Sequence, residues 1–373
     1  MLKKTVSILM LLALVLMSGC WDARDIEELD ICTAVVVDWQ DGKYSFYVEV
    51  VDIASNKKGQ EGDGQSLKST VVMAEGESFA EARHDLDRML NKPAYLGAVQ
   101  SLIMTESLAN QGIEEYMYRV REIGEYRKTM DMIITPDNPA DILNIKPENS
   151  TTVGFAVEDA MQNLLEQGVT FHVSLADVLQ KLCAHNKSYL LSTLGIKREQ
   201  ISLLGYTVFN GGQRMGYIPY EDARGIVFVM VGGEKQTPKF LYVVNVGEEV
   251  YTLETSLKRN AIKAAWDGTR ASFTVDMDFE AMLLYQSSAK PVTSEVEKQL
   301  STGLSDQLLA DVTQAIQTSV AYGCDYLYFS EPFRITYPSV YEQVDWGSTF
   351  TNADFSVNIN LELVEHASYD YSR

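Results

Sequence analysis

Apolar and polar positions in the first two hundred residues alternate between strand-like and helix-like patterns. The β-branched runs 31–39 and 44–53 flank Asp41-Gly42, a pair typical of a tight β-hairpin turn. Ser78, with Glu81 three residues later, has the pattern of a capping box and predicts the start of a helix. We also expect strands over 69–74, 98–105 and 129–135 and helices over 106–120 (one or two), 155–167 and 174–182. A loop is expected over 56–65, and a loop with one short helix over 137–152.

The pattern changes near residue 200, where strands begin to dominate. A second hairpin is predicted from 201–210 and 215–218, which flank Gly211-Gly212. Further strands are expected over 240–246, 250–257, 271–285 and 355–364. The longest helical pattern covers 296–321, where Leu300, Leu304, Leu308 and Val312 recur every four residues. Such a stripe predicts a face that packs against the core.

The N-terminus has the organisation of a secretory signal. Lys3 and Lys4 precede an apolar run from Thr5 to Met17. This run of roughly 13 residues is shorter than the about 20 that a membrane-spanning helix requires. A short basic start, a short apolar run and a small-residue exit are instead typical of a signal peptide. Cys20 stands at that exit and has three possible roles: a core residue of a transmembrane helix, a disulfide partner or an attachment point. The short length of the apolar run excludes the transmembrane helix.

Ser18-Gly19-Cys20 resembles a bacterial lipobox, in which the cysteine thiol receives a diacylglycerol and becomes the mature N-terminus. Met17 stands where Leu is usual, and the two residues are similar in size and polarity. If Cys20 is lipidated, three cysteines remain, which cannot all pair, and they form no CxxC motif. We therefore expect Cys20 to be the lipid-attachment residue, and Cys32, Cys183 and Cys324 to be free thiols.

Strands with helices inserted among them, rather than regular βαβ units, predict a multi-domain α+β protein with mostly antiparallel sheets. The expected division is a signal peptide over 1–19, an N-terminal α+β domain over 20–200, possibly of two subdomains, and a C-terminal α+β domain over 201–373. The chain has 373 residues and is 46% hydrophobic, which suits globular domains of this size.

The net charge of −21 narrows the function classes. Nucleic-acid binding needs a basic surface, so that class is not expected. Anionic membranes attract basic segments, so charge does not hold this chain at a membrane either. Membrane attachment then depends on the lipid alone, and the two acyl chains of a diacylglyceryl group are sufficient for it.

No established catalytic or cofactor motif emerges from the sequence. Gly59, Gly62 and Gly64 lie in a polar loop with no helix start after them, which argues against a phosphate loop, and no GxSxG motif occurs. Cys183 and His185 are two residues apart, on different faces of a helix, so a metal site would need another histidine as well. Isolated histidines are favoured, and we expect neither an enzyme nor a cofactor. The histidines are His84, His172, His185 and His366.

Three other groups of residues have both a structural and a functional interpretation. One face of a predicted strand carries Asp276, Asp278 and Glu280. These acids could bind Ca²⁺, but we favour the interpretation that they form the solvated face of a sheet. The second group is a cluster of charged residues, in which Arg121 and Glu125 are four positions apart and close enough to pair on a helix. This cluster is either a solvated helix face or a contact with a partner protein. An aromatic group is either core or interface. The cluster is Arg119, Arg121, Glu122, Glu125 and Arg127, and the aromatic group is Tyr337, Tyr341, Trp346 and Phe350.

The segment GCWDARDIEEL resembles the start of the mature Ger(x)C spore germination lipoproteins, through Cys20, Trp21, Asp22, Ile26 and Leu29. The likeness continues in order along the chain. Its further positions are Val37-Asp38; Glu106, Leu108, Ala109, Gly112 and Ile113; the charge cluster 121–127; Gly205, Phe209, Gly216, Glu221 and Gly225; Cys324-Asp325; and Tyr337-Pro338 to Trp346. Asp25 is a departure, since Glu is commoner there.

The resemblance implies a lipid-anchored C subunit of a germinant receptor on the outer face of the spore inner membrane. Such a subunit works with an integral-membrane A subunit and a transporter-like B subunit, and the complex triggers germination in response to nutrients. The body of the family is described as several α+β domains. Two alternatives remain: an extracytoplasmic solute-binding lipoprotein, and a cell-wall or lipid hydrolase, for which the sequence offers no nucleophile-and-base pair.

Overall fold

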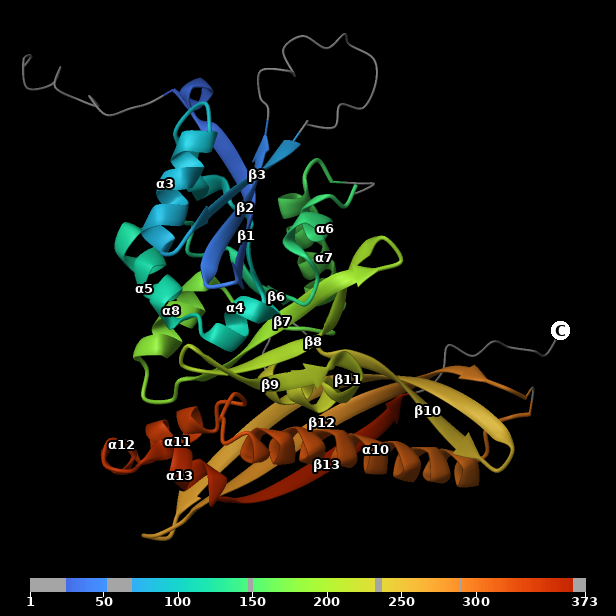
Figure 1. Cartoon of the computed structure of the whole chain (residues 1–373). Coiled ribbons are helices and arrows are strands. Elements are labelled where there is room, and N and C mark those ends of the chain that lie inside the picture. Colours follow the sequence, from blue (N-terminus) through green and yellow to red (C-terminus); the bar gives the residue numbers. More distant parts are fainter. Residues whose placement is uncertain (1–24, 52–68, 147–149, 232–236, 289, 365–373) are drawn as a thin grey trace, which may run out of the picture.

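The computed structural model describes residues 25–51, 69–146, 150–231, 237–288 and 290–364, which form two β-sheets with helices packed on them (Figure 1). The first sheet has the strand order β3-β2-β1-β5-β6-β7-β8-β9, with β4 beside β1, and the second has the order β10-β11-β12-β13. Cys20, the whole of the loop 56–65 and His366 lie outside the described residues.

The strands are β1 (Asp30–Gln40), β2 (Lys43–Val51), β3 (Ser69–Gly76), β4 (Ala94–Tyr95), β5 (Ser101–Thr105), β6 (Asp131–Thr135), β7 (Ser188–Lys197), β8 (Gln200–Asn210), β9 (Gln213–Pro219), β10 (Lys239–Val246), β11 (Glu249–Trp266), β12 (Ala271–Gln286) and β13 (Asp354–Val364). The α-helices are α3 (Phe79–Met89), α4 (Glu106–Gln111), α5 (Glu114–Ile123), α6 (Pro139–Leu143), α7 (Val153–Glu166), α8 (Leu175–Cys183), α9 (Arg224–Met230), α10 (Ser294–Ala321), α11 (Ser330–Thr336), α12 (Pro338–Tyr341) and α13 (Trp346–Thr351). The 3-10 helices are η1 (Ile26–Glu28), η2 (Leu96–Ala98) and η3 (Tyr220–Asp222).

The hairpin predicted at the N-terminus is confirmed as β1 and β2. Its turn residues Asp41 and Gly42 have φ of 52° and 81°, the left-handed conformation that two-residue hairpin turns require. The multi-domain α+β class is also confirmed. The centre of the first sheet differs from the expected antiparallel order, because β1, β5, β6 and β7 pair in parallel. Parallel neighbours need crossover connections, and the helices α3 to α8 lie in those connections.

Helices cover both faces of the first sheet (Figure 1). Val35 and Val37 of β1 belong to one core cluster, which includes residues of α3, α5 and α8. Ala34 and Val36 point to the opposite face and belong to a second cluster with α6 and α7. All four side chains are buried, which explains why β1 is a continuous apolar run rather than an alternating one.

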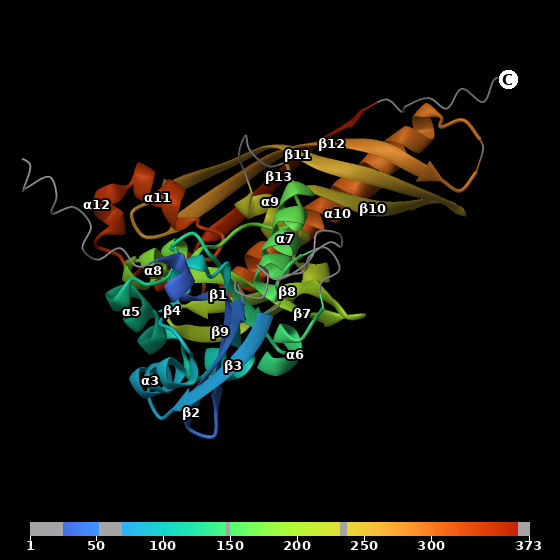
Figure 2. The same cartoon turned by 90° about the horizontal axis from the view of Figure 1, so that it is seen from above.

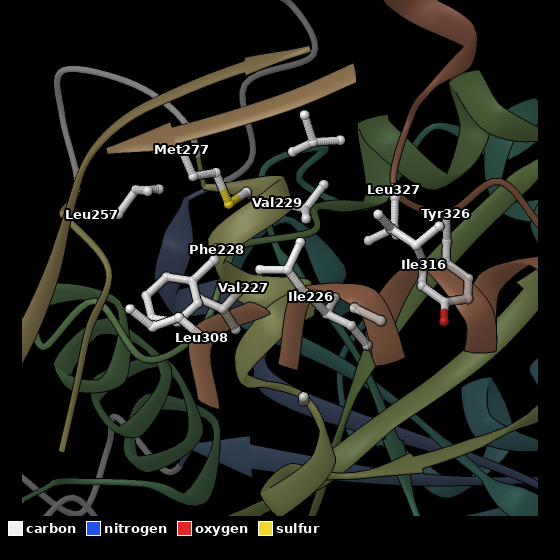
Figure 3. Packing of buried hydrophobic residues seen from close by; sticks show 14 of the residues in the cluster. Ile226, Val227, Phe228, Val229, Leu257, Met277, Leu308, Ile316, Tyr326 and Leu327 are labelled. Atoms are coloured by element: carbon white, nitrogen blue, oxygen red, sulfur yellow. The ribbon is translucent and has the colours of Figure 1, made fainter. Parts of the chain in front are cut away.

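The two sheets lie side by side (Figure 2), and a third core joins them (Figure 3). The stripe on α10 is confirmed, since Leu304, Leu308 and Val312 are completely buried there. Phe228 of α9 packs against Phe240 of β10 and Phe279 of β12, with ring centroids 5.2 and 4.9 Å apart. The same cluster contains buried residues of β8, so α9 and α10 lie between the second sheet and the first.

The larger elements that were not expected from the sequence are β7, α9, the second half of β11 and the helices α11 to α13. The expected boundary at residue 200 stays a prediction. Strands β7 and β8, on its two sides, pair as an antiparallel hairpin of one sheet, from Ser188↔Asn210 to Lys197↔Gln200.

Candidate functional site

The histidines and cysteines named above lie in separate places. His172 Nδ1 is 2.9 Å from Asp131 Oδ1, and His185 Nε2 lies 3.2 Å from the carbonyl of Val344. Cys183 is exposed, whereas Cys32 and Cys324 are buried free thiols. Burial raises the pKa of Cys32 to about 12, so its thiol stays protonated. Within the described ranges no three His, Cys, Asp or Glu side chains are placed to hold a metal ion.

The three acids of β12 form a row of ion pairs with β11. Asp276 pairs with Lys263 at 2.7 Å, Asp278 with Arg259 at 3.2 Å and Glu280 with Lys258 at 2.5 Å. Asn358 and Asn360 of β13 donate hydrogen bonds to the two aspartates, at 2.8 and 3.4 Å. The opposite face of β12 carries Val275, Met277, Phe279 and Ala281, all buried. The acids are therefore the solvated face of the sheet, and their charges are balanced by basic neighbours.

The charge cluster at the C-terminal end of α5 pairs differently from the expectation. Gly124 has φ 66° and ends α5, so Arg121 and Glu125 do not lie on one helix, and the predicted pair between them was wrong. Glu125 pairs instead with Arg83 of α3 at 2.5 Å. The other arginines pair with Glu122 (Arg119) and Glu158 (Arg127), and Arg121 stacks on the ring of Tyr118.

A small apolar cavity of about 100 Å³ lies between β1, β2, α3 and α5, and the paired Arg83 and Glu125 are part of its lining. Phe46, Phe79 and Tyr116 line it, and the last two stack with centroids 4.7 Å apart. Tyr116 and Tyr126, also in the lining, share a hydrogen bond of 3.2 Å between their hydroxyls. The size and lining suit a compact apolar group.

The C-terminal aromatic group belongs to the core, which is the first of the two interpretations given above. Trp346, Phe350 and Tyr341 are 3%, 0% and 7% exposed. Tyr341 and Phe350 pack against Trp346, which contacts Asp325. Asp325 is itself 2% exposed and accepts four hydrogen bonds. The donors are Phe329 N (2.8 Å), Ser330 N (2.8 Å), Trp346 Nε1 (3.0 Å) and Asn186 Nδ2 (3.1 Å). Burial raises the pKa of Asp325 to about 6, while these donors act in the opposite direction.

Asn186 makes this cluster a joint between two parts of the chain. It follows α8, and its Nδ2 also lies 2.8 Å from both the Asp325 carbonyl and Ser330 Oγ. Lys181 of α8 lies over the ring of Tyr328 at 3.8 Å. Tyr328 has φ 63°, a left-handed conformation that is uncommon for such a residue. We call Asn186, Asp325, Ser330 and Trp346 the α8 joint.

The α8 joint holds parts together rather than exposing a reactive group. Asp325 is inaccessible and its oxygens are occupied by donors, so it cannot serve a substrate from solvent. Sequence inspection named Asp325 and Trp346 but missed Asn186, because a polar residue between a helix and a strand carries no pattern that distinguishes it from a loop residue. In the part of the chain that the structure describes, no helix combines the length and apolar character needed to cross a bilayer.

These features define the class of protein: an α+β body in which buried polar side chains connect separate segments of the chain. Residues 22–196 match the family described as "Spore germination protein N-terminal domain", and residues 204–366 match "Spore germination B3/ GerAC like, C-terminal". The chain therefore belongs to the Ger(x)C family of spore germination proteins.

Relatives from Bacillus subtilis (strain 168) match over nearly their whole length. Spore germination protein YndF is 20% identical over 95% of each chain, and spore germination protein B3 is 19% identical over 97% of each. The crystal structure of the GerBC protein covers 89% of this chain and 97% of its own, with a TM-score of 0.54 and 15% identity. At that identity the likeness establishes a shared fold.

Proposed function

We propose that the chain is a lipid-anchored, non-enzymatic subunit of a germinant receptor. It acts with an integral-membrane A subunit and a transporter-like B subunit at the outer face of the spore inner membrane, and triggers germination in response to nutrients. The observation that carries the proposal is a family match over both halves of a chain that begins with a signal-like run and Ser18-Gly19-Cys20.

The names of relatives support this role. Spore germination protein A3 of Bacillus subtilis (strain 168) is 22% identical over 74% of this chain and 72% of its own. The geometry supports it as well, because the candidate polar groups are engaged with neighbours inside the fold, buried at Asp325 and on the solvated face of the sheet at β12. The α8 joint and the ion pairs of β12 position structural elements, which suits a body that contacts other proteins rather than transforming a substrate.

The experiment is Cys20→Ala in spores, with Cys183→Ala as the matched control, since Cys183 is exposed in the folded body. Membrane and soluble fractions are probed for the protein, and nutrient-triggered germination is followed in the same spores. We expect the Cys20 variant to leave the membrane fraction and to germinate poorly, while the control behaves as the native protein. Normal germination by a wholly soluble Cys20→Ala protein would contradict the proposal.

A solute-binding lipoprotein is the second candidate, favoured by the apolar cavity that Arg83 and Glu125 help to line. Calorimetry of the purified chain with candidate nutrients separates the two functions. Micromolar binding by the chain alone, abolished by Ala80→Phe in the cavity lining, supports a solute-binding protein. Binding seen only when the A and B subunits are present supports the receptor subunit.

A further inference from the structure

One end of the molecule lies within a short tether of the lipid-attachment residue. The described chain begins at Asp25, five positions after Cys20. Each residue spans at most about 3.6 Å, so at most about 18 Å separates the two Cα atoms. Whatever surface surrounds Asp25 and η1 is therefore held close to a bilayer that contains the acyl chains of Cys20, and this step rests on the lipid anchor of the proposed function.

Three elements meet at this end: η1, the C-terminus of α3 and the segment 91–95. Asp30 Oδ2 accepts hydrogen bonds from the backbone N–H groups of Asn91 and Lys92, at 3.1 and 3.0 Å. Lys92 Nζ donates to the carbonyl of Glu27 at 2.5 Å. Strand β4 then pairs with the start of β1, with Tyr95 opposite Ile31. We call these three elements the anchor end, which the contacts hold in one arrangement (Figure 1).

The anchor end exposes one large apolar side chain from each of its elements. Ile26 of η1 and Met89 of α3 are each 58% exposed, and Tyr95 is 44% exposed. Single exposed apolar residues are ordinary on protein surfaces. Three of them on adjoining elements, at the point where a lipid tether emerges, are arranged as membrane-contacting residues are. Tyrosine in particular is enriched at the level of lipid head groups.

Charge at the anchor end does not draw it to an anionic membrane. Asp25, Glu27, Glu28 and Asp87 are exposed acids and Asp30 is half-buried, against the exposed bases Arg88 and Lys92. Contact with lipid would then depend on the apolar side chains, and anionic lipid would not strengthen it.

We propose that the anchor end rests on the bilayer surface, with Ile26, Met89 and Tyr95 among the lipid head groups, so that the single lipid anchor also fixes the orientation of the body. The second sheet then lies on the side of the molecule away from this contact (Figure 1), and its edge strand β10 carries the exposed Leu241 and Val243.

The test uses the full lipidated chain in vesicles of phosphatidylcholine, with and without phosphatidylglycerol. A fluorophore is attached to single cysteines introduced by Ile26→Cys, Met89→Cys and Tyr95→Cys in a Cys183→Ala background, where the remaining thiols are buried. Met215→Cys on β9 and Leu241→Cys on β10 are the controls, since both native side chains are similarly exposed. Quenching by lipids that carry a nitroxide on the head group reports contact.

We expect quenching at the three anchor-end positions about threefold above the two controls, and no stronger in the vesicles that contain phosphatidylglycerol. Equal quenching at all five positions overturns the orientation, even if the protein stays with the vesicles. Loss of the protein from the vesicles is scored separately by flotation, and it overturns the lipid anchor itself. In a third outcome, the nitroxide lipids do not quench the three labels, and a water-soluble quencher is excluded from them only when the A and B subunits are present. The surface is then a protein contact, and the bilayer proposal fails.

Discussion

Glu49 of β2 lies at the N-terminus of helix α7, where it accepts a hydrogen bond of 2.8 Å from the backbone N–H of Val153. Its second oxygen accepts the N–H of Gly154 at 3.0 Å and the hydroxyl of Thr33 at 2.7 Å. The first oxygen also accepts from Ser69 Oγ at 3.1 Å. Glu49 is 1% exposed, and the partial positive charge of the helix N-terminus stabilises its carboxylate. One side chain therefore fixes α7 to the first sheet.

Removing this carboxylate should destabilise the fold. Glu49→Ala leaves the buried donors of Val153, Gly154 and Thr33 without their acceptor, so we expect a loss of about 3 kcal/mol in the free energy of unfolding. Urea unfolding followed by circular dichroism measures it. Glu248→Ala, in the exposed turn between β10 and β11, is the control and should change stability by less than about 0.5 kcal/mol. Equal effects of the two changes would show that the α7 contact is unimportant.

Gly225 allows α9 to approach α10 closely. A Cβ built at Gly225 meets the carbonyl oxygen of Asp311 at 2.0 Å, which is backbone and cannot move aside. Gly225→Ala should therefore cost more than about 2 kcal/mol of stability, although alanine favours helices. Gly303→Ala, within α10, meets only the side chain of Val244 at 3.0 Å and should cost less than about 1 kcal/mol. Thermal unfolding of both variants tests the order, and the reverse order would refute the close approach.

The His172–Asp131 pair should make stability depend on pH. The hydrogen bond to Asp131 raises the pKa of His172 above its usual 6.5, so folding favours the protonated ring. A raised pKa in the folded state gives stability that is complete below the unfolded pKa and is lost as pH rises through the folded value. Stability should thus fall as pH increases above about 6.5.

Asp131→Asn removes the carboxylate and should flatten this dependence, while His84→Gln, on the exposed side of α3, should leave it unchanged. Unfolding measured across pH 6 to 8 gives the slopes. An unchanged slope in Asp131→Asn would assign the pH dependence to other groups.

Trp346→Phe tests the α8 joint without emptying the core. The ring is largely kept, but the indole N–H that donates to Asp325 at 3.0 Å is lost. We expect a loss of about 1–3 kcal/mol, because a buried carboxylate gives up one of its donors. The matched control is Trp266→Phe, whose indole is only half-buried against Phe333. Limited proteolysis should also cut the 325–353 region faster in Trp346→Phe than in the control, and identical digestion of both would contradict the joint.

Local patterns of the sequence predicted a large part of the fold. The Asp41-Gly42 turn, the cap at Ser78 and the leucine stripe of α10 depend on neighbours within a few residues, and each was found. At Ser78 only half of the capping box forms, since Ser78 Oγ accepts from Glu81 N while the Glu81 carboxylate accepts from Glu77 N.

The missed parts depend on distant contacts. The segment of α9, RGIVFVM, is rich in β-branched residues that favour strands, and it is helical where Gly225 packs on α10. The parallel order of β5 and β6 follows from crossovers that no local pattern encodes. The α8 joint unites Asn186 and Asp325, 139 positions apart, and sequence spacing gives no sign of that contact.

Purification of the tagged chain from the membranes of sporulating cells tests the central proposal most directly. Mild detergent extracts are compared for native protein and for Cys20→Ala, and the proteins that accompany each are identified by mass spectrometry. The proposal predicts that a multi-span A subunit and a transporter-like B subunit accompany the native chain, and that both are depleted from the Cys20→Ala sample. Recovery of the native chain from the membrane without either partner would contradict it.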